Sequence, residues 1–335
     1  MKDLPIVTIV CPTLNEEKHI EKTLNSFLNQ ELRTVQLEIF IIDGMSNDLT
    51  REIVSKYSNN YSNVRLIDNP NRKTPYAFNK GIAEAKGEYV AILGAHTEYS
   101  TNYIQTCVDE INRTGSVGCA GRVLTKNLGT TNNEYFCKLI MSNKFAVSGN
   151  SFRTVKEGYT SVVNFPVYQK KIFDLVGTYD LTLHRNQDND LNSRIIQNGY
   201  KLYNTWKTEC WYAPPSNLKK VFMYAYKNGF WSAKSFLKKP KSMKLHHFIP
   251  FFFVLYLIIF FIASVVASIF NLYQFVFIYP LIAVIILHLG TGLYFAYKMD
   301  ESKTLSTLIK LPFLFFAFHF SYGWGTFLGF ITPIR

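Results

Sequence analysis

The chain has 335 residues, which is enough for one catalytic domain and an appendage. Its formal net charge of +12 suits three kinds of partner: nucleic acid, an anionic membrane surface or phosphorylated substrates. Its five cysteines are scattered without a CxxC pair, which argues against a thiolate metal cage and favours a reducing compartment. No signal peptide precedes the first strand-like segment, so we expect the N-terminal domain to stay on the cytoplasmic side.

The first third of the chain alternates strand and helix signals. Short apolar, β-branched runs predict strands, and apolar residues at helical spacing predict the helices between them. The predicted strands are residues 6–10, 37–42, 64–67 and 89–93, and the predicted helices are residues 16–28, a segment starting at Asp48, and residues 75–85. This order predicts a Rossmann-like α/β domain with a mainly parallel sheet flanked by helices. Ligands of such sheets bind at the carboxyl ends of the strands.

Residues 115–215 show a less regular pattern, with Gly, Asn and Thr clusters and strand-like pieces near residues 161–169. Segments of this kind build the acceptor side of a site. We therefore expect one α/β domain over residues 1–215, divided into a first half (1–114) and a less regular second half (115–215).

A basic segment without acidic residues follows this domain. No Asp or Glu occurs between Cys210 and Met299, whereas eight lysines lie between Lys219 and Lys244. Because the lysines directly precede an apolar run and no recognition motif accompanies them, they favour lipid headgroups over nucleic acid. Residues 216–247 are predicted to form a basic amphipathic interfacial segment, and the alternative is an ordinary helix packed on the catalytic domain.

Three apolar stretches close the sequence. Residues 248–270, 272–297 and 311–331 are each long enough to span a bilayer, and Asn271 separates the first two. Basic flanks favour the cytoplasmic side for the ends of the hairpin that these two would form. Residues 248–335 thus predict a multi-pass region of about three helices in the cell membrane. The alternative is that the third stretch lies in the interface or re-enters.

Four polar segments follow predicted strands or precede a predicted helix. They are residues 10–17, 41–50, 91–96 and 185–190. Polar groups at strand ends can bind a nucleotide, an imidazole can hold a transition metal, and a carboxylate at a helix start can act as a base. Each segment alone is also explained by helix capping, by Asp48 or Asp190 for example.

Together the four segments resemble glycosyltransferase family 2, the inverting enzymes with a GT-A fold, and within it the succinoglycan-biosynthesis type. The shared features are Thr13-Leu14-Asn15-Glu16-Glu17, Asp43-Gly44, Ala95-His96, Arg185-Asn186-Gln187-Asp188 and the late His319-Phe320-Ser321-Tyr322-Gly323. The resemblance covers nearly the whole chain. It implies that residues 1–215 are a catalytic domain, with a nucleotide-sugar-binding half (1–114) and an acceptor-side half (115–215).

The resemblance implies a role for each motif residue. Donor-binding roles fall on Pro12, Thr13, Asn15, Glu16, Asp43, Ser46, Lys73, Asn79, Gly94 and Ala95. His96 takes the position of the metal-binding residue, for Mn²⁺ or Mg²⁺, and Asp188 that of the general base. Asn186 and Gln187 fall on the acceptor side.

Three departures from the family pattern stand out. Gly94 occupies the position of the first acidic residue of the metal triplet, and Gln187 replaces the usual Glu before the base. The Q-x-x-R-W motif of processive members is replaced by residues 226–231, Tyr-Lys-Asn-Gly-Phe-Trp. The last departure predicts transfer of one sugar per binding event.

The expected activity is transfer from a nucleotide-diphosphate sugar to a polyprenyl-linked saccharide at the cytoplasmic membrane face, in cell-surface polysaccharide synthesis. One alternative is transfer onto polyprenyl phosphate itself. Another is a non-catalytic membrane scaffold that kept the fold. The sequence leaves the sugar, the metal and the oligomeric state open.

Overall fold

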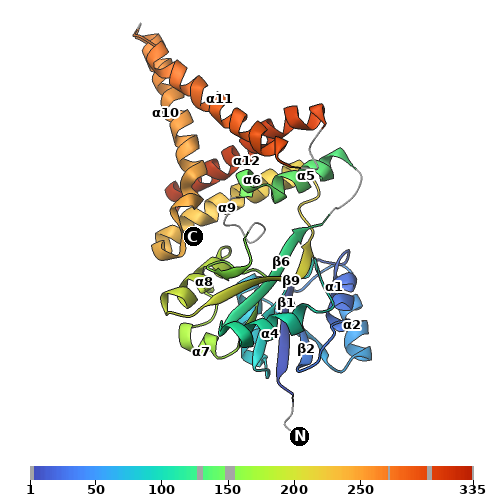
Figure 1. Cartoon of the computed structure of the whole chain (residues 1–335). Helices are drawn as coiled ribbons and strands as arrows, with labels where there is room; N and C mark the ends of the chain where they lie inside the picture. The colour runs from blue at the N-terminus through green and yellow to red at the C-terminus, as the bar shows by residue number, and fades with distance from the viewer. Residues whose placement is uncertain (1–3, 127–130, 148–154, 271, 300–303, 334–335) are drawn as a thin grey trace. The chain divides into compact units, whose positions relative to one another are not determined.

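The computed structural model describes residues 4–126, 131–147, 155–270, 272–299 and 304–333 (Figure 1). The chain forms two compact units, of which the first comprises Met1–Lys126 and Val155–Ala213. The second comprises Asn127–Thr154 and Pro214–Arg335. Residues 131–147 lie within the half expected to face the acceptor, yet they cluster with the C-terminal helices.

The first unit is built on a sheet of nine strands among its described residues. The strands run in the order β3-β2-β1-β4-β8-β6-β9-β5, and β7 pairs with β9. Their bounds are β1 Ile6–Thr13, β2 Gln36–Asp43, β3 Val64–Asp68, β4 Tyr89–Ile92, β5 Thr97–Tyr99, β6 Gly118–Thr125, β7 Gly158–Thr160, β8 Val167–Gln169 and β9 Leu202–Tyr212. The first four strands are all parallel, as the sequence predicts, whereas β8, β5 and β7 pair antiparallel and make the sheet mixed.

Six helices of this unit accompany the sheet: α1 Ile20–Leu28, α2 Thr50–Asn60, α3 Thr74–Glu84, α4 Tyr103–Thr114, α7 Ile172–Val176 and α8 Gln187–Gln197. Apolar residues of α3 and of β1, β2 and β4 form one buried core. Gly81 allows α3 to approach closely, because a Cβ there would lie 2.4 Å from Val10 Cγ1. The carboxyl ends of these strands are thereby held at one edge of the sheet.

Several predicted boundaries were wrong. The first helix begins at Ile20 rather than residue 16, since residues 14–19 form a loop. The helix near the expected base begins at Gln187 rather than Leu191. Residues 161–166 connect β7 to β8 and are not strand. The sequence reasoning also missed β6 and β9, which are paired in parallel.

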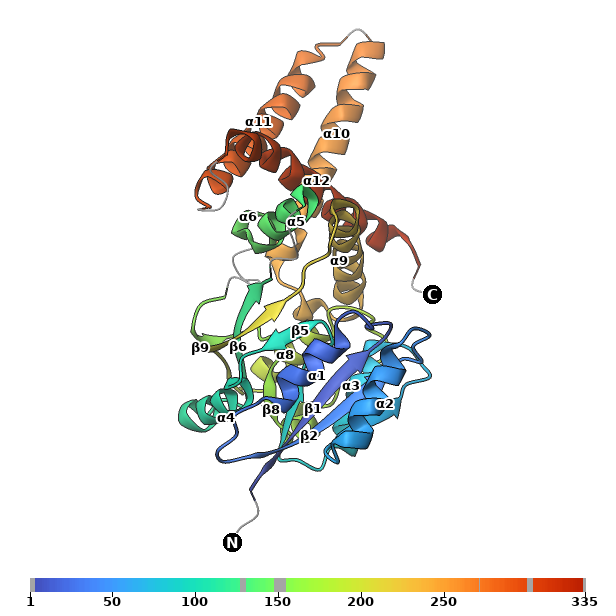
Figure 2. The ribbon, with the colours of Figure 1, turned by 90° about the vertical axis from the view of Figure 1, so that its right-hand side faces the viewer.

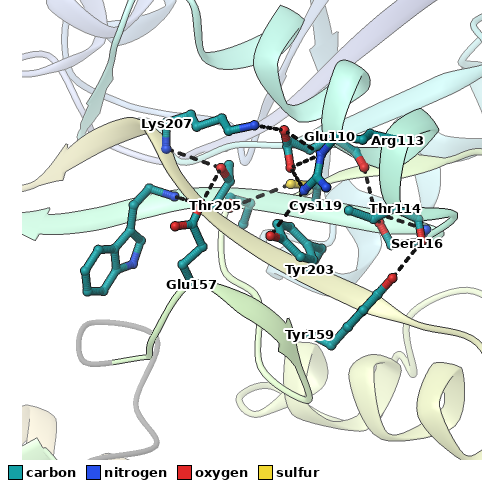
Figure 3. A network of polar contacts seen from close by, with 12 residues as sticks. Glu110, Arg113, Thr114, Ser116, Cys119, Glu157, Tyr159, Tyr203, Thr205 and Lys207 are labelled. Atoms are coloured by element: carbon teal, nitrogen blue, oxygen red, sulfur yellow. Dashed lines mark hydrogen bonds and ion pairs between the residues drawn. The ribbon is translucent and has the colours of Figure 1, made fainter.

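A polar network fixes α4 against β9 (Figure 3). Glu110 on α4 is almost fully buried and forms ion pairs with Arg113 at 2.5 Å and Lys207 at 2.7 Å. The hydrogen bond from Arg113, together with that from Lys207, holds the pKa of the Glu110 carboxyl below its usual value. The network therefore ties the second half of the sheet to its covering helix.

The second unit is helical. Its elements are α5 Asn132–Ser142, α6 Lys144–Val147, α9 Leu218–Lys238, the short 3₁₀ helices η1 Pro240–Ser242 and η2 Leu245–Phe248, and α10 Ile249–Ile269, α11 Phe275–Tyr297 and α12 Leu305–Ile331. A buried apolar cluster unites α5, α6, α9, α11 and α12. The predicted basic segment is thus mainly one long helix, α9.

Three helices are long and apolar enough to cross a membrane: Leu245–Ile269, Phe275–Tyr297 and Leu305–Ile331. The third begins at Leu305 rather than residue 311, because the Thr304 hydroxyl caps it by accepting from the Thr307 amide at 3.3 Å. Asn271, the predicted separator, lies outside the described residues.

Candidate active site

The loops that follow β1 and β2 are bonded to each other. The Asn15 amide donates to the Ser46 hydroxyl at 2.8 Å, and the Asn47 amide donates to the Asn15 side-chain oxygen at 3.0 Å. The Gly44 amide donates to the Thr13 carbonyl at 2.7 Å, where Thr13 and Asp43 are register partners. The two sequence motifs therefore form one continuous surface at the edge of the sheet. Pro12 lies one residue earlier in β1 and is half-buried.

Asp43 is fully buried at the end of β2. Its carboxylate accepts from the Ser46 amide at 2.9 Å, from the Ser46 hydroxyl at 2.5 Å and from Arg51 at 2.6 Å. Arg51 also pairs with Asp68 at 2.8 Å, the last residue of β3. Since a carboxylate offers about four acceptor sites, the protein itself takes three of them. These three bonds fix the carboxylate at the end of β2.

Arg51 was missed by the sequence reasoning. It lies one residue beyond the predicted second motif, and its partners Asp43 and Asp68 come from two neighbouring strand ends. The only available signal was a cation on the first turn of the helix after β2, and this is not distinctive.

His96 lies beyond β4, directly before β5, and contacts Glu16. Its Nδ1 is 3.2 Å from Glu16 Oε1, and the two side chains are 37% and 22% exposed. The imidazole packs edge-on against Tyr212 with ring centroids 5.3 Å apart. A carboxylate accepting from Nδ1–H fixes the tautomer that leaves the Nε2 lone pair available. The structure therefore brings Glu16 to the predicted metal ligand.

The space beside Gly94 is filled by an aromatic ring. A Cβ at Gly94 would lie 2.9 Å from Phe165 Cε1, closer than real Cβ contacts allow. The Gly94 amide donates to the Tyr99 hydroxyl at 2.8 Å, and Ala95 is buried with its carbonyl accepting from Thr23. The ring of Phe165 thus occupies the place of the acidic side chain that the family pattern expects.

Asp188 lies in the first turn of α8. The residue before the helix, Asn186, has a φ of +60°, a left-handed conformation that Asn tolerates better than most residues. Burial raises the pKa of the Asp188 carboxyl above its usual value, although the Asn189 amide donates to it at 2.9 Å. The side-chain oxygen of Gln187 is buried without a hydrogen-bond partner. The start of α8 therefore offers a carboxylate of raised basicity and a free acceptor.

Two sets of contacts hold α8 in place. The Tyr168 hydroxyl on β8 donates to Asn192 at 3.0 Å, and Asn192 donates to the Val163 carbonyl at 3.2 Å. Asp190 is buried and accepts from Arg194 at 3.0 Å, so it is not the helix cap that the sequence suggested. The segment 163–165 therefore contacts α8 at one end and Gly94 at the other.

Two predicted donor-binding residues, Asn79 and Lys73, contact residues outside the loops that follow β1 and β2. Asn79 donates to the Tyr179 carbonyl at 2.8 Å and accepts from the Tyr179 amide at 2.9 Å, so one of its two N–H groups and one of its two acceptor sites are used within the protein. Lys73 is exposed in the position before α3, and its carbonyl accepts from Asn69 at 3.1 Å.

The candidate site brings together only a few side chains that could bind a divalent cation. No group of three or more His, Cys, Asp or Glu side chains gathers as a metal cage within the described ranges. Magnesium-type ions need no such cage, since one or two protein ligands, substrate phosphates and water complete their shell. His96, oriented by Glu16, offers one nitrogen ligand here.

Comparisons with known proteins identify the family of the first unit. The profile "Glycosyl transferase family 2" matches residues 8–172, which contain the first three motifs. A Methanococcus voltae protein, dolichyl N-acetyl-alpha-D-glucosaminyl phosphate 3-beta-D-2,3-diacetamido-2,3-dideoxy-beta-D-glucuronosyltransferase, is 28% identical over 97% of each chain. A succinoglycan biosynthesis protein of Rhizobium meliloti is 29% identical over 72% of this chain and 73% of its own.

A solved structure supports the fold. It is a mannosyltransferase from Pyrobaculum calidifontis in complex with GDP-Man and Mn²⁺, with a TM-score of 0.59 and 16% identity. The match covers 96% of this chain and 88% of the other. Residues 8–172 are therefore a glycosyl transferase family 2 domain within a GT-A fold, and the protein is a glycosyltransferase.

Proposed function

We propose that the protein transfers one sugar from a nucleotide-diphosphate sugar to a lipid-linked saccharide, with inversion at the anomeric carbon. The observation that carries this proposal is the position of the half-buried Asp188 in the first turn of α8, next to the unpartnered side-chain oxygen of Gln187, and burial raises the pKa of its carboxyl. The relative from Methanococcus voltae, which matches nearly end to end, is named for transfer to a dolichyl-phosphate-linked sugar.

Asp188 is the proposed base. Its raised pKa strengthens it as a proton acceptor. It takes the proton of the acceptor hydroxyl as the oxygen attacks the anomeric carbon from the side opposite the nucleoside diphosphate. The C–O bond to the diphosphate then breaks, and attack from the opposite side gives inversion. The unpartnered oxygen of Gln187 accepts from a neighbouring hydroxyl of the acceptor.

The donor is proposed to bind over the bonded loops after β1 and β2. Asn15 and Ser46 lie on these loops, Thr13 and Asp43 are buried directly beneath them, and Arg51 holds Asp43 in place. Because these groups are already bonded to one another, the surface is organised before the donor arrives. Less reorganisation on binding favours affinity.

His96 would hold a divalent cation, Mn²⁺ or Mg²⁺, with Glu16 orienting the imidazole. When bound, such an ion supplies Lewis-acid neutralisation of the leaving diphosphate. The proposal rests on the donor set of this chain, and the mannosyltransferase of similar fold was solved with Mn²⁺.

The acceptor and the location are proposed from the second unit. Three helices are apolar and long enough to cross a bilayer, and lysines precede them. We place the protein in the cell membrane as a multi-pass protein with its catalytic unit on the cytoplasmic face. The Rhizobium relative is named for succinoglycan biosynthesis, so the product belongs to cell-surface polysaccharide synthesis.

The test is product analysis with the purified full-length protein. Radiolabelled nucleotide sugars are supplied with Mn²⁺ and with either a polyprenyl-diphosphate-linked saccharide or polyprenyl phosphate. The proposal expects label on the extended saccharide lipid, with the anomeric configuration opposite to that of the donor. Label only on polyprenyl phosphate would favour the alternative enzyme. Retention of configuration would contradict the inverting mechanism.

A further inference from the structure

We infer that only the α10–α11 hairpin crosses the bilayer, and that α9 and α12 lie side by side in the membrane interface on the catalytic side. The C-terminus then returns to the face that carries the active site. This inference rests on the proposed membrane attachment, and it concerns contacts within the second unit alone.

The first step is that α9 and α12 run parallel from Tyr226 to Lys234 of α9. A Cβ on Gly325 would lie 2.1 Å from the Tyr226 carbonyl oxygen, and one on Gly329 would lie 2.5 Å from that of Phe230. One turn further, the buried Lys234 ammonium donates to the Thr332 carbonyl. Residue numbers rise together on both helices, so the pair is parallel and packed backbone to backbone.

The second step is a count of crossings. Suppose that α10 and α11 cross and that α9 crosses outward from the catalytic side. Then α10 returns inward, α11 goes outward and α12 must come inward, antiparallel to α9. The observed pairing is parallel, so the two helices cannot both cross. Because they contact each other from Tyr226–Gly325 to Lys234–Thr332, one cannot cross while the other stays outside.

The third step is where α12 meets the hairpin. It contacts the first two turns of α10, where a Cβ on Gly323 would lie 2.1 Å from the Pro250 carbonyl oxygen. It contacts the second half of α11, where His288 is 2.9 Å from His319 and a Cβ on Gly292 would lie 3.2 Å from Pro312 Cα. Both places lie toward the end of the hairpin where α10 begins and α11 ends. Figure 2 shows α12 crossing there while α10 and α11 project beyond it.

The rest of the hairpin has little protein around it. In the most apolar stretch of each helix, 11% of α10 and 6% of α11 residues are buried, against 33% for α12. The projecting part of the hairpin therefore suits the bilayer interior. The end crossed by α12 carries the lysines of residues 238–244 and Lys298, which belong at the headgroups.

The fourth step concerns the side chains that α9 and α12 expose. Exposed apolar side chains form one stripe along α12: Ile309, Phe313, Phe320, Trp324 and Ile331. Lys219, Lys220 and Lys227 are exposed on α9, and Lys227 lies in its middle. A charged lysine at the centre of a spanning helix is costly to insert into a bilayer. An apolar stripe beside a basic helix instead suits the interface of an anionic leaflet.

Cysteine accessibility tests the crossing count in the full-length protein. All five native cysteines are buried, so the wild type is the blank for a membrane-impermeant maleimide. Single variants are made at exposed positions: Asn60→Cys in the catalytic unit, Tyr273→Cys at the hairpin tip and Pro333→Cys after α12. Transferase activity of each variant is measured separately, so a failure of the proposed function is recognised independently.

In inverted bacterial membrane vesicles, we expect Asn60→Cys and Pro333→Cys to react before detergent is added. Tyr273→Cys should react only afterwards. Protection of Pro333→Cys together with Tyr273→Cys would overturn the inference in favour of three crossings. Reaction of Tyr273→Cys in intact vesicles would overturn the crossing of the hairpin itself.

Depth measurements test the in-plane orientation independently. Nitroxides are attached to Phe313→Cys, Phe320→Cys and Ile331→Cys, which share the exposed stripe, with Ile259→Cys on α10 as the deep control. Phe313 and Ile331 are about 27 Å apart along a helix axis. The inference expects one shared shallow depth from oxygen and nickel-chelate accessibility. A steady change of depth along α12 would contradict it.

Discussion

Arg51 holds a buried carboxylate at the donor surface, and its removal should weaken the catalytic unit. The Asp43 side chain is fully buried, and Arg51→Ala would leave it with the two donors of Ser46. Breaking a buried ion pair costs about 3–5 kcal/mol. Arg51 is 33% exposed, so water reaches part of the vacated space and we expect about 2 kcal/mol.

For a unit of this size, 2 kcal/mol corresponds to a fall in Tm of about 4–8 °C. Thermal unfolding of the purified protein measures it, and Arg33→Ala is the matched control. Arg33 also pairs with one carboxylate, Asp109, but the side chains are 73% and 44% exposed. That variant should change Tm by no more than about 2 °C. Equal Tm values for the two variants would refute the view that Arg51 stabilises Asp43.

Three further predictions concern the catalytic chemistry. Glu16→Gln should lower Mn²⁺ affinity about 10-fold, since it weakens the hydrogen bond that orients His96. Electron paramagnetic resonance measures Mn²⁺ binding, and an unchanged affinity would contradict this prediction. Gly94→Asp should fail to raise Mn²⁺ affinity while Phe165 fills that space, whereas adding Phe165→Ala should allow a rise. Activity should fall on acidification as the Asp188 carboxyl becomes protonated. The fall should occur at a pH above the ordinary pKa of Asp, because burial raises the pKa of Asp188. A pH–rate profile without this acid limb would count against Asp188 as the base.

The sequence predicted the parallel half of the sheet because its strands are short apolar runs closed by turns. It failed for β9, whose residues mix Trp, Tyr, Lys and Glu and are stabilised by pairing with three other strands. It also placed the start of α8 too late, because the left-handed conformation of Asn186 starts the helix without a recognisable cap.

The candidate site could be predicted only at the level of motifs. The positions of Asp43, His96 and Asp188 follow from strand ends and a helix start. The partners of Asp43 and His96 could not be predicted in this way, because Arg51 and Glu16 reach them from neighbouring segments. Likewise, the apolar character of α12 suggested a third span, whereas its pairing with α9 depends on small residues facing backbone atoms.

The most direct test of the central claim is Asp188→Asn, a change that keeps the shape of the side chain and removes the base. Asp174→Asn is the control, because Asp174 is an exposed carboxylate on α7. Transfer and donor binding are measured side by side, by product formation and by calorimetry. We predict that Asp188→Asn lowers kcat by about 10²–10⁴-fold with donor affinity unchanged, while Asp174→Asn behaves as the wild type. Normal turnover by Asp188→Asn would contradict the account.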